Sequence, residues 1–292
     1  MRPDAWHLTE DVDDFLARAG DFLCSRPALH TTPLTVTEKL RTRGADVYGA
    51  EATVFGRLES GGEVRAVYYC PPSHRLTLTP LPPEHADHLA AHLADLGHPL
   101  SGVTADHDTA TAFAETWQRH TGAAPVSTWR ARLYRLGALT PPAPLPEGRG
   151  RVVDAQDHEQ LIRWCAEFVA AVGEAPAIDA DSWADSRFAD KHFTFWETPD
   201  GTPVSMAGST SMIGGMIRVD PVYTPAHLRG RGYAGAVTVE VSRAALTAGA
   251  TDVVLFADPA NPTSNALYQR IGYVPVTDFT GYDFSYDAPE VG

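Results

Sequence analysis

The segment Val222–Gly235 (VYTPAHLRGRGYAG) joins a predicted strand to a predicted helix through a loop rich in glycine and arginine. The first turn of a helix presents backbone N–H groups without intrahelical partners, and its dipole favours an anion there. Gly230 and Gly232 allow the backbone to curl closely around such an anion. Arg229 and Arg231 can add charge-assisted hydrogen bonds to phosphate oxygens. The segment therefore predicts a site for a phosphorylated ligand.

The same glycines also satisfy the dinucleotide-binding fingerprint Gly230-x-Gly232-x-x-Gly235, with Asp258 in the position of the ribose-binding acid. In a dinucleotide-binding fold this loop follows the first strand of several βα units. Here three predicted antiparallel strands precede the loop and few strands follow it. An NAD(P)-binding oxidoreductase is therefore a remote alternative, and a purely structural glycine turn is another.

A second motif occupies residues 258–273 (DPANPTSNALYQRIGY) and describes the end of a strand followed by a short helix. Asn261 or Thr263 can cap the start of that helix. Ser264 and Tyr268 are four residues apart, so they share one helix face. Taken alone, Tyr268 also fits a packed core aromatic. The motif therefore places a hydroxyl and a phenol on one face of a short helix.

Together, RGRGYA and NPTSNALYQRIGY resemble the GNAT superfamily of acyl-CoA-dependent N-acyltransferases. The string VYTPxxxRGRGYA is most similar to its glycine-N-acyltransferase-like branch, and the resemblance covers about residues 150–287. It implies acetyl-CoA or another acyl-CoA as co-substrate, no metal, and direct attack by the primary amine of a small molecule. A non-catalytic acyl-CoA-binding regulatory module is the alternative.

The resemblance also implies roles for individual residues. Tyr268 matches the tyrosine that protonates the departing CoA thiolate, the splayed strand at 222–224 pairs with pantetheine, and the loop at 229–234 holds the pyrophosphate. One departure is Ala226, where the related branch usually has a second proline. The implied cofactor-binding residues are Val222, Tyr223, Thr224, Arg229, Gly230, Arg231, Gly232, Tyr233, Ala234, Asn261 and Ser264.

The general base is harder to identify from the sequence. In the GNAT fold the first two helices border the acceptor pocket, and this segment carries the acids Glu167, Glu174, Asp179, Asp181 and Asp185. A cluster of like charges can raise a carboxyl pKa and attract a cationic amine. Glu174, just after the first helix, is the first candidate, and His192 is an alternative. A solvated acidic face is the competing interpretation for each acid.

Element patterns predict an α+β protein with two GNAT-like domains, each a mixed, mostly antiparallel sheet flanked by helices. The segment 138–150 holds four prolines and two glycines and predicts a linker. Residues 151–292 form the catalytic acyl-CoA-binding domain in this prediction. Its predicted helices are 157–172, 181–190, 232–249 and 263–271, and its predicted strands are 192–197, 203–212, 216–224, 252–257, 273–276 and 282–286.

Residues 1–137 lack both motifs and predict a degenerate, non-catalytic GNAT-like domain. Strands at 64–70 and 75–79, helices at 84–96 and 109–120, and a strand at 128–136 roughly echo the second half. His88 and His92 are four residues apart and, with His85 and His98, raise the possibility of a metal pair. Without a nearby carboxylate motif, a solvent-facing helix is the preferred interpretation.

Composition limits the remaining function classes. The 292 residues are 43% hydrophobic and carry a net charge of −14, so a folded protein is expected and non-specific nucleic-acid binding is not. Cys24, Cys70 and Cys165 form no CxxC pair, which argues against a disulfide framework or a cysteine zinc site. No signal peptide or long apolar run is evident. We expect a cytoplasmic protein that binds neither nucleic acid nor membranes. Its acceptor is expected to be a small, cationic amine. The sequence gives no indication of the oligomeric state.

Overall fold

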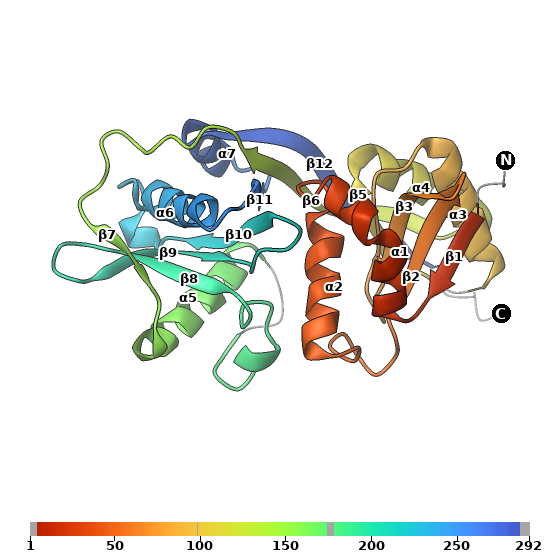
Figure 1. Ribbon diagram of the computed structural model, residues 1–292, viewed down its shortest axis with the longest axis horizontal. Helices are drawn as coiled ribbons and strands as arrows, with labels where there is room; N and C mark the ends of the chain where they lie inside the picture. The colour runs from red at the N-terminus through yellow and green to blue at the C-terminus, as the bar shows by residue number, and fades with distance from the viewer. Residues whose placement is uncertain (1–4, 98, 174–177, 287–292) are drawn as a thin grey trace, which may run out of the picture. The chain divides into compact units, whose positions relative to one another are not determined.

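The computed structural model describes residues 5–97, 99–173 and 178–286 of the chain (Figure 1). The chain divides into two units: unit 1 comprises Met1–Leu133 and Val276–Gly292, and unit 2 comprises Tyr134–Pro275. In the part of the chain that is described, no helix is both long and apolar enough to cross a membrane.

Unit 1 is built on a sheet with the strand order β1-β2-β3-β4-β5, in which β4 and β5 run parallel and the other neighbours run antiparallel. Buried residues of α3 and α4, among them Leu89, Phe113 and Trp117, form its core with the sheet. Its elements are β1 (Ala5–Thr9), α1 (Val12–Ser25), α2 (Thr31–Arg43), β2 (Val54–Ser60), β3 (Glu63–Cys70), β4 (Leu76–Leu78), α3 (Pro83–Asp95), β5 (Gly102–Asp106), α4 (His107–Thr121) and β6 (Ala124–Leu136).

Unit 2 repeats this design with the strand order β7-β8-β9-β10-β11, again with a parallel pair, β10 and β11, after antiparallel neighbours. Its elements are β7 (Arg149–Val152), α5 (His158–Ala171), β8 (His192–Glu197), β9 (Pro203–Ser209), β10 (Met216–Tyr223), α6 (Tyr233–Thr247), β11 (Asp252–Ala257), α7 (Pro262–Arg270) and β12 (Tyr273–Ser285). Both units are mixed, mostly antiparallel sheets flanked by helices, so the predicted α+β class is confirmed.

The last strand of each sheet comes from a distant part of the chain. β12 passes from unit 2 into unit 1, where Phe279–Asp283 pair antiparallel with residues 102–106 of β5. β6 passes the other way, and its end from Tyr134 onward lies beside β11. Unit 1 therefore completes its sheet with β12, which follows the last helix of unit 2, and unit 2 completes its sheet with the end of β6, which follows the last helix of unit 1. Residues 276–286 thus belong to unit 1.

Helices cover both faces of the unit 2 sheet, with α6 on one side and α5 on the other (Figure 1). The apolar stripe of α5 buries Leu161, Trp164, Cys165 and Val169 against β8 and β10, as its helical spacing predicts. α6 is more uniformly apolar and buries residues from Gly235 to Ala245. Helices therefore cover both faces of the sheet.

The segment 138–148 has no regular secondary structure and lies against α6 and α7. The Thr140 N–H donates to the Ile271 carbonyl at 3.0 Å, and the Trp196 indole donates to the Glu147 carbonyl at 3.3 Å. Pro146 lies beside Gly232 at the start of α6. This proline-rich segment is therefore fastened to unit 2 along its length, and β7 begins within the predicted linker at Arg149.

The helix predicted at 181–190 is wrong: the structure has only a single 3-10 turn there, Trp183–Asp185. Asp179 and Ser182 explain the difference, because the Ser182 hydroxyl donates to the Asp179 carboxylate at 2.8 Å while the Ser182 N–H donates to the same carboxylate at 2.9 Å. Side chains of these types satisfy local backbone groups and so compete with a helix.

The two final strands predicted at 273–276 and 282–286 are one continuous strand, β12. The predicted break between them contains Gly281, which pairs with Thr104 in mid-ladder. A Cβ at this position would lie 2.8 Å from Arg75 Nη1 and 3.3 Å from Trp129 Cβ. The glycine therefore permits close packing across the strand rather than a reversal of the chain.

A buried ion cluster joins β8 and β10 on the α5 side of the sheet. The Asp220 carboxylate accepts hydrogen bonds from the Lys191 ammonium and, at 3.1 Å, from Arg187 Nη1. Burial lowers the pKa of Lys191 to about 8 although Asp220 opposes this. Burial alone would raise the pKa of Asp220, but Lys191, Arg187 and Arg218 outweigh it and hold that pKa well below its usual range. The Asp220 carboxylate is thus the counter-charge of the Lys191 ammonium, whose side chain is only 6% exposed.

Asp220→Asn leaves Lys191 buried without a counter-charge, and we expect it to lower the free energy of unfolding by about 3 kcal/mol. Lys191→Met is expected to cost clearly less, because Asp220 keeps its contact with Arg187. Urea unfolding followed by circular dichroism measures both. Equal losses in the two variants would contradict this account of the cluster.

Candidate functional site

Strands β10 and β11 part along their length. They pair in parallel at Met216–Arg218 and Asp252–Val254. Beyond these residues β10 continues to Tyr223 and β11 to Ala257, yet in the described structure they do not pair with each other there. The backbone groups at the ends of both strands are therefore available to a ligand that lies between them.

A bulge in β10 accompanies this separation. The pairing of β10 with β9 shifts register between Val219 and Val222. Pro221 lies within the shift and has no N–H to give to either neighbouring strand. Such a bulge re-aims the residues that follow it, and Val222 then lies on the α6 side while Tyr223 packs on the α5 side.

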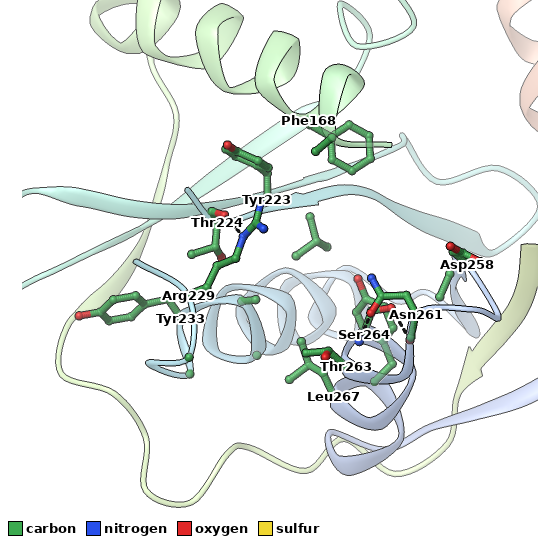
Figure 2. Close-up of a pocket in the computed structure, with 18 of the residues that line it drawn as sticks. Phe168, Tyr223, Thr224, Arg229, Tyr233, Asp258, Asn261, Thr263, Ser264 and Leu267 are labelled. Carbon is green, nitrogen blue, oxygen red and sulfur yellow. Dashed lines mark hydrogen bonds between the residues drawn. The ribbon is translucent and has the colours of Figure 1, made fainter. Parts of the chain in front are cut away.

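A cleft of about 790 Å³ occupies the opening (Figure 2). Its walls are the ends of β10 and β11, the loop before α6, the first turn of α6, α7, and the end of α5. Every predicted cofactor-binding residue lines it, and Tyr268 lines it too. These residues are Val222, Tyr223, Thr224, Arg229, Gly230, Arg231, Gly232, Tyr233, Ala234, Asn261 and Ser264. Glu174, the first candidate base, lies outside the described residues.

The loop before α6 presents a row of unused donors to the cleft. Gly230 and Gly232 have φ values of 78° and 83°, a left-handed conformation that favours glycine. Within the described structure, the backbone N–H groups of residues 230–235 make no hydrogen bond, and the first that does, Ala236, donates to Gly232 O at 3.1 Å. Consecutive free N–H groups at a helix start form an anion site.

The two arginines of the loop, both predicted phosphate ligands, make different contacts within the protein. Arg229 folds back, and its Nε donates to the Thr224 carbonyl at 3.0 Å (Figure 2). Arg231 is exposed, and its Nη2 donates only to the His227 carbonyl, at 3.4 Å. Arg229 therefore shapes the turn after β10, whereas Arg231 presents its charge at the rim of the cleft.

Tyr223 links the cleft to α5. Its hydroxyl donates to Glu167 Oε2 at 2.7 Å. Burial, with the neighbouring Glu167, raises the pKa of Tyr223 to about 12. The side chain of Glu167 is exposed, and this residue lies one helical turn before Ala171, which lines the cleft. Glu167 is one of the acids predicted from the sequence as candidate bases, and its carboxylate contacts Tyr223, a residue that lines the cleft.

A buried network that sequence reasoning missed holds the start of α7. The Asn261 side chain caps the helix by accepting from the Ser264 N–H at 3.1 Å. Asn265 is buried, and its Nδ2 donates to the carbonyls of Asp258 and Asn261 at 2.7 and 2.6 Å. The Tyr134 hydroxyl donates to Asn265 Oδ1 at 2.6 Å. The sequence did contain a signal for this network: Asn265 follows the capping residue Asn261 by four residues, so its side chain faces the turn at the start of the helix.

Tyr268 brings an unpartnered hydroxyl to the cleft. Its ring packs between Tyr134 and Tyr273 at centroid distances of 6.3 and 6.1 Å, and the residue is 8% exposed. No hydrogen bond to its hydroxyl occurs among the described residues. Burial, reinforced by the charge of Asp220, raises the pKa of Tyr268 above its usual value. The phenol therefore stays protonated and can donate to a ligand.

The other base candidates do not line the cleft. The Asp179 carboxylate is engaged with Ser182, whose backbone and hydroxyl bonds lower its pKa. Asp181 and Asp185 are exposed in the connection after α5. His192 is exposed, and its Nε2 lies 3.3 Å from the Ser211 hydroxyl. Of the described candidates, only Glu167 reaches the cleft through a hydrogen bond.

Topology argues against the dinucleotide interpretation of the glycines. Three antiparallel strands, β8, β9 and β10, precede the loop, whereas a dinucleotide-binding fold places it after the first of several parallel strands. The Asp258 carboxylate, the supposed ribose ligand, accepts from the Ala260 N–H at 2.8 Å. It thus tightens the turn that leads into α7.

In unit 1 the corresponding helix start lacks the donors. α3 follows β4 through the residues 79–82 and begins at Pro83, with Pro82 as its N-cap. Prolines have no N–H, and the N–H of Leu81, which precedes these two prolines, donates to Thr109 Oγ1 at 3.0 Å. This segment therefore offers no row of free N–H groups to an anion.

The phenol has no counterpart in unit 1 either. Asp106 caps α4 by accepting from Thr109 N at 3.2 Å, just as Asn261 caps α7 three residues before Ser264. Counting from these two caps, the position of Tyr268 is taken by Phe113, which is fully buried. No group of three or more potential metal ligands occurs in the described ranges, which include His85, His88 and His92 but not His98.

Comparisons with known proteins agree with this geometry. Residues 209–279, which hold the loop, α6, β11 and α7, match the family model described as FR47-like protein. No curated protein matches the chain. A GCN5-related N-acetyltransferase structure from Sphaerobacter thermophilus shares 20% identity over 99% of this chain and 99% of its own, with a TM-score of 0.57.

Two further structures share the fold over the whole chain. A tandem GNAT protein from the clavulanic acid biosynthesis pathway has 13% identity over 98% of this chain and 100% of its own, with a TM-score of 0.58. A Drosophila protein has 14% identity over 96% and 99%, with a TM-score of 0.64. The chain therefore has the fold of GNAT acetyltransferases, with two GNAT-like domains.

A pair of glycine substitutions tests the anion site. Gly232→Ala and Gly249→Ala both place a Cβ at a left-handed residue, φ 83° and 94°; neither Cβ meets a clash, since the first would lie 3.7 Å from Pro146 and the second in open space. Each should lower the free energy of unfolding by roughly 1 kcal/mol, but only Gly232→Ala should weaken binding of CoA, by about tenfold. Isothermal titration calorimetry measures the affinities. Equal affinities in the two variants would contradict a ligand site at the start of α6.

Proposed function

We propose that this protein is an N-acyltransferase, of the glycine-N-acyltransferase-like type, that moves an acetyl or other acyl group from acyl-CoA to the primary amine of a small molecule. The observation that carries this proposal is one cleft that combines three features. These are the parted ends of β10 and β11, the free N–H groups of residues 230–235, and the unpartnered phenol of Tyr268.

In the proposed complex the donor lies along the cleft. The N–H groups of 230–235 bind its diphosphate, and the backbone of Val222–Thr224 with Asn261 binds the pantetheine arm. The amine attacks the thioester carbonyl directly. A backbone N–H of the open end of β10 polarises that carbonyl as negative charge develops on its oxygen. The carbon–sulfur bond then breaks, and Tyr268 gives its proton to the thiolate sulfur.

The proton of the attacking amine needs an acceptor. Glu174 is the first candidate from sequence and Glu167 is the second, supported by its 2.7 Å contact with the cleft residue Tyr223. Tyr223 orients one oxygen of the Glu167 carboxylate and leaves the other able to accept a proton. A carboxylate here also attracts a cationic acceptor, as does the net charge of −14.

We assign catalysis to unit 2 alone. Unit 1 has Pro82 and Pro83 where unit 2 has its donor-rich loop, and Phe113 where unit 2 has Tyr268. These replacements support a degenerate first domain that completes the fold without binding acyl-CoA. The catalytic domain is then unit 2, Tyr134–Pro275, with the end of β6 supplying its last strand.

The proposal predicts selective stabilisation by acyl-CoA. We expect acetyl-CoA at about 100 times its Kd to stabilise the folded protein by about 2.7 kcal/mol, and NAD(P) to give no shift in Tm. Differential scanning fluorimetry with CoA, acetyl-CoA, longer acyl-CoAs and NAD(P) makes the comparison. A panel of amines with detection of the released free thiol then identifies the acceptor. Stabilisation by NAD(P) alone would support the oxidoreductase instead.

Tyr268→Phe should lower kcat by roughly tenfold to a thousandfold and leave the Kd of acetyl-CoA almost unchanged, because only the transition state needs its proton. Folding stability should also persist, since the hydroxyl has no partner in the described protein. Burial raises the pKa of Tyr268, so its phenol should keep its proton up to about pH 9. We therefore expect no fall in wild-type kcat below that pH from deprotonation of Tyr268.

Tyr273→Phe is the matched control for this variant. Its hydroxyl is equally buried but bonds Ser242 Oγ at 2.7 Å, so its loss should cost stability, about 1 kcal/mol, and not turnover. Steady-state kinetics and urea unfolding on both variants separate the two effects. If Tyr268→Phe binds acetyl-CoA and turns over like wild type, Tyr268 is not the acid; if no amine is ever acylated, the non-catalytic binding module is favoured.

A further inference from the structure

One cation of the cleft has no use in the proposed function. The arginines that line the cleft are Arg229, Arg231 and Arg270. Arg229 is bonded to the Thr224 carbonyl, and Arg231 belongs to the anion loop. Arg270, in the last turn of α7, is exposed and makes neither an ion pair nor a side-chain hydrogen bond within the described residues.

The position of Arg270 is set by the contact between α7 and the first turn of α6. Gly235 lets the helices approach closely, since a Cβ there would lie only 3.0 Å from Leu267 Cδ1. Arg270 follows Leu267 by three residues and so lies on the same helix face, one turn further along. It is nine residues from Asn261 at the other end of α7, about 13 Å at the rise of an α-helix.

Tyr268 and Arg270 are two residues apart on α7, so they project from different sides of this helix. Tyr268 and the parted strands offer the uncharged groups that suit a thioester, whereas Arg270 and Arg231 line the same cleft as the free N–H groups at the start of α6. Acyl-CoA carries three phosphates: two in the diphosphate and one on the ribose 3′-oxygen. The six N–H groups of 230–235 suit the diphosphate, which leaves the remaining dianion free to pair with a separate cation.

We propose that Arg270 binds the ribose 3′-phosphate of CoA, an inference that rests on the proposed acyl-CoA site. The guanidinium supplies paired N–H donors that match phosphate oxygens in geometry and charge. The site is then selective for the 3′-phosphorylated nucleotide. It discriminates against thioesters that carry the same pantetheine arm without this phosphate, including dephospho-CoA and carrier-protein thioesters.

The test compares CoA with 3′-dephospho-CoA on the full-length protein. Wild type should bind CoA about 10 to 100 times more tightly than dephospho-CoA, as expected for a charge-assisted contact. Arg270→Gln should reduce this ratio to about 1–3 by weakening CoA binding while leaving the Kd of dephospho-CoA unchanged. Arg270→Lys should retain part of the preference, because the charge remains. Titration calorimetry at two salt concentrations gives the ratios.

Arg243→Gln is the control. This arginine is exposed on α6, pairs with Glu240 at 2.6 Å, and does not line the cleft, so its loss should leave the ratio at the wild-type value. The inference is overturned if wild type binds both nucleotides equally, if Arg270→Gln keeps the preference, or if it weakens both ligands alike. Binding of neither nucleotide by wild type is a different result, because it overturns the proposed acyl-CoA site itself.

Discussion

Hydrogen bonds between β10 and β11 stop after Arg218 and Val254, and the rest of the site depends on this interruption. Two parallel neighbours in an enclosed sheet would ordinarily pair to their ends, because unpaired backbone groups away from water are costly. Here the bulge at Pro221 turns the end of β10, and Arg229 ties the following loop to Thr224. The strand ends are thus held apart, and their backbone groups require a ligand or water as partner.

The same interruption explains why α6 begins where it does. The chain leaves the open end of β10, turns through two left-handed glycines, and starts a helix whose first N–H groups face the opening. The wall across from it is α7, whose start is fixed by Asn265 and Tyr134. Tyr134 comes from β6, the strand that unit 2 takes from the end of the first half of the sequence. The exchange of strands therefore contributes directly to the geometry of the cleft.

Local chemistry made much of this predictable. The strand at 252–257, the helix at 262–270 and the loop between β10 and α6 follow from short-range signals such as a capping asparagine and a glycine-rich turn. What the sequence concealed depends on contacts between distant residues. The strand β12 was predicted as two pieces, and the glycine in the predicted break, Gly281, packs against Arg75 and Trp129, which are far away in the chain. Asp220 and Lys191 form an ion pair across two strands, and no spacing rule connects them.

Arg270 was missed for a related reason, since a basic residue in the last turn of a helix is ordinarily explained by the helix dipole. Only the contact of Leu267 with Gly235 brings that turn to the cleft. With it, the charges lining the cleft become asymmetric: arginines gather around the start of α6, whereas Asp258 lies at the start of α7. In a protein of net charge −14, this local reversal of sign favours, in the proposed complex, a donor whose polyanionic part lies against the start of α6. The uncharged groups around the phenol of Tyr268 are then left for the proposed thioester and amine. Because the attraction between unlike charges falls off with distance and salt, this arrangement within the cleft, rather than the net charge, would orient the donor.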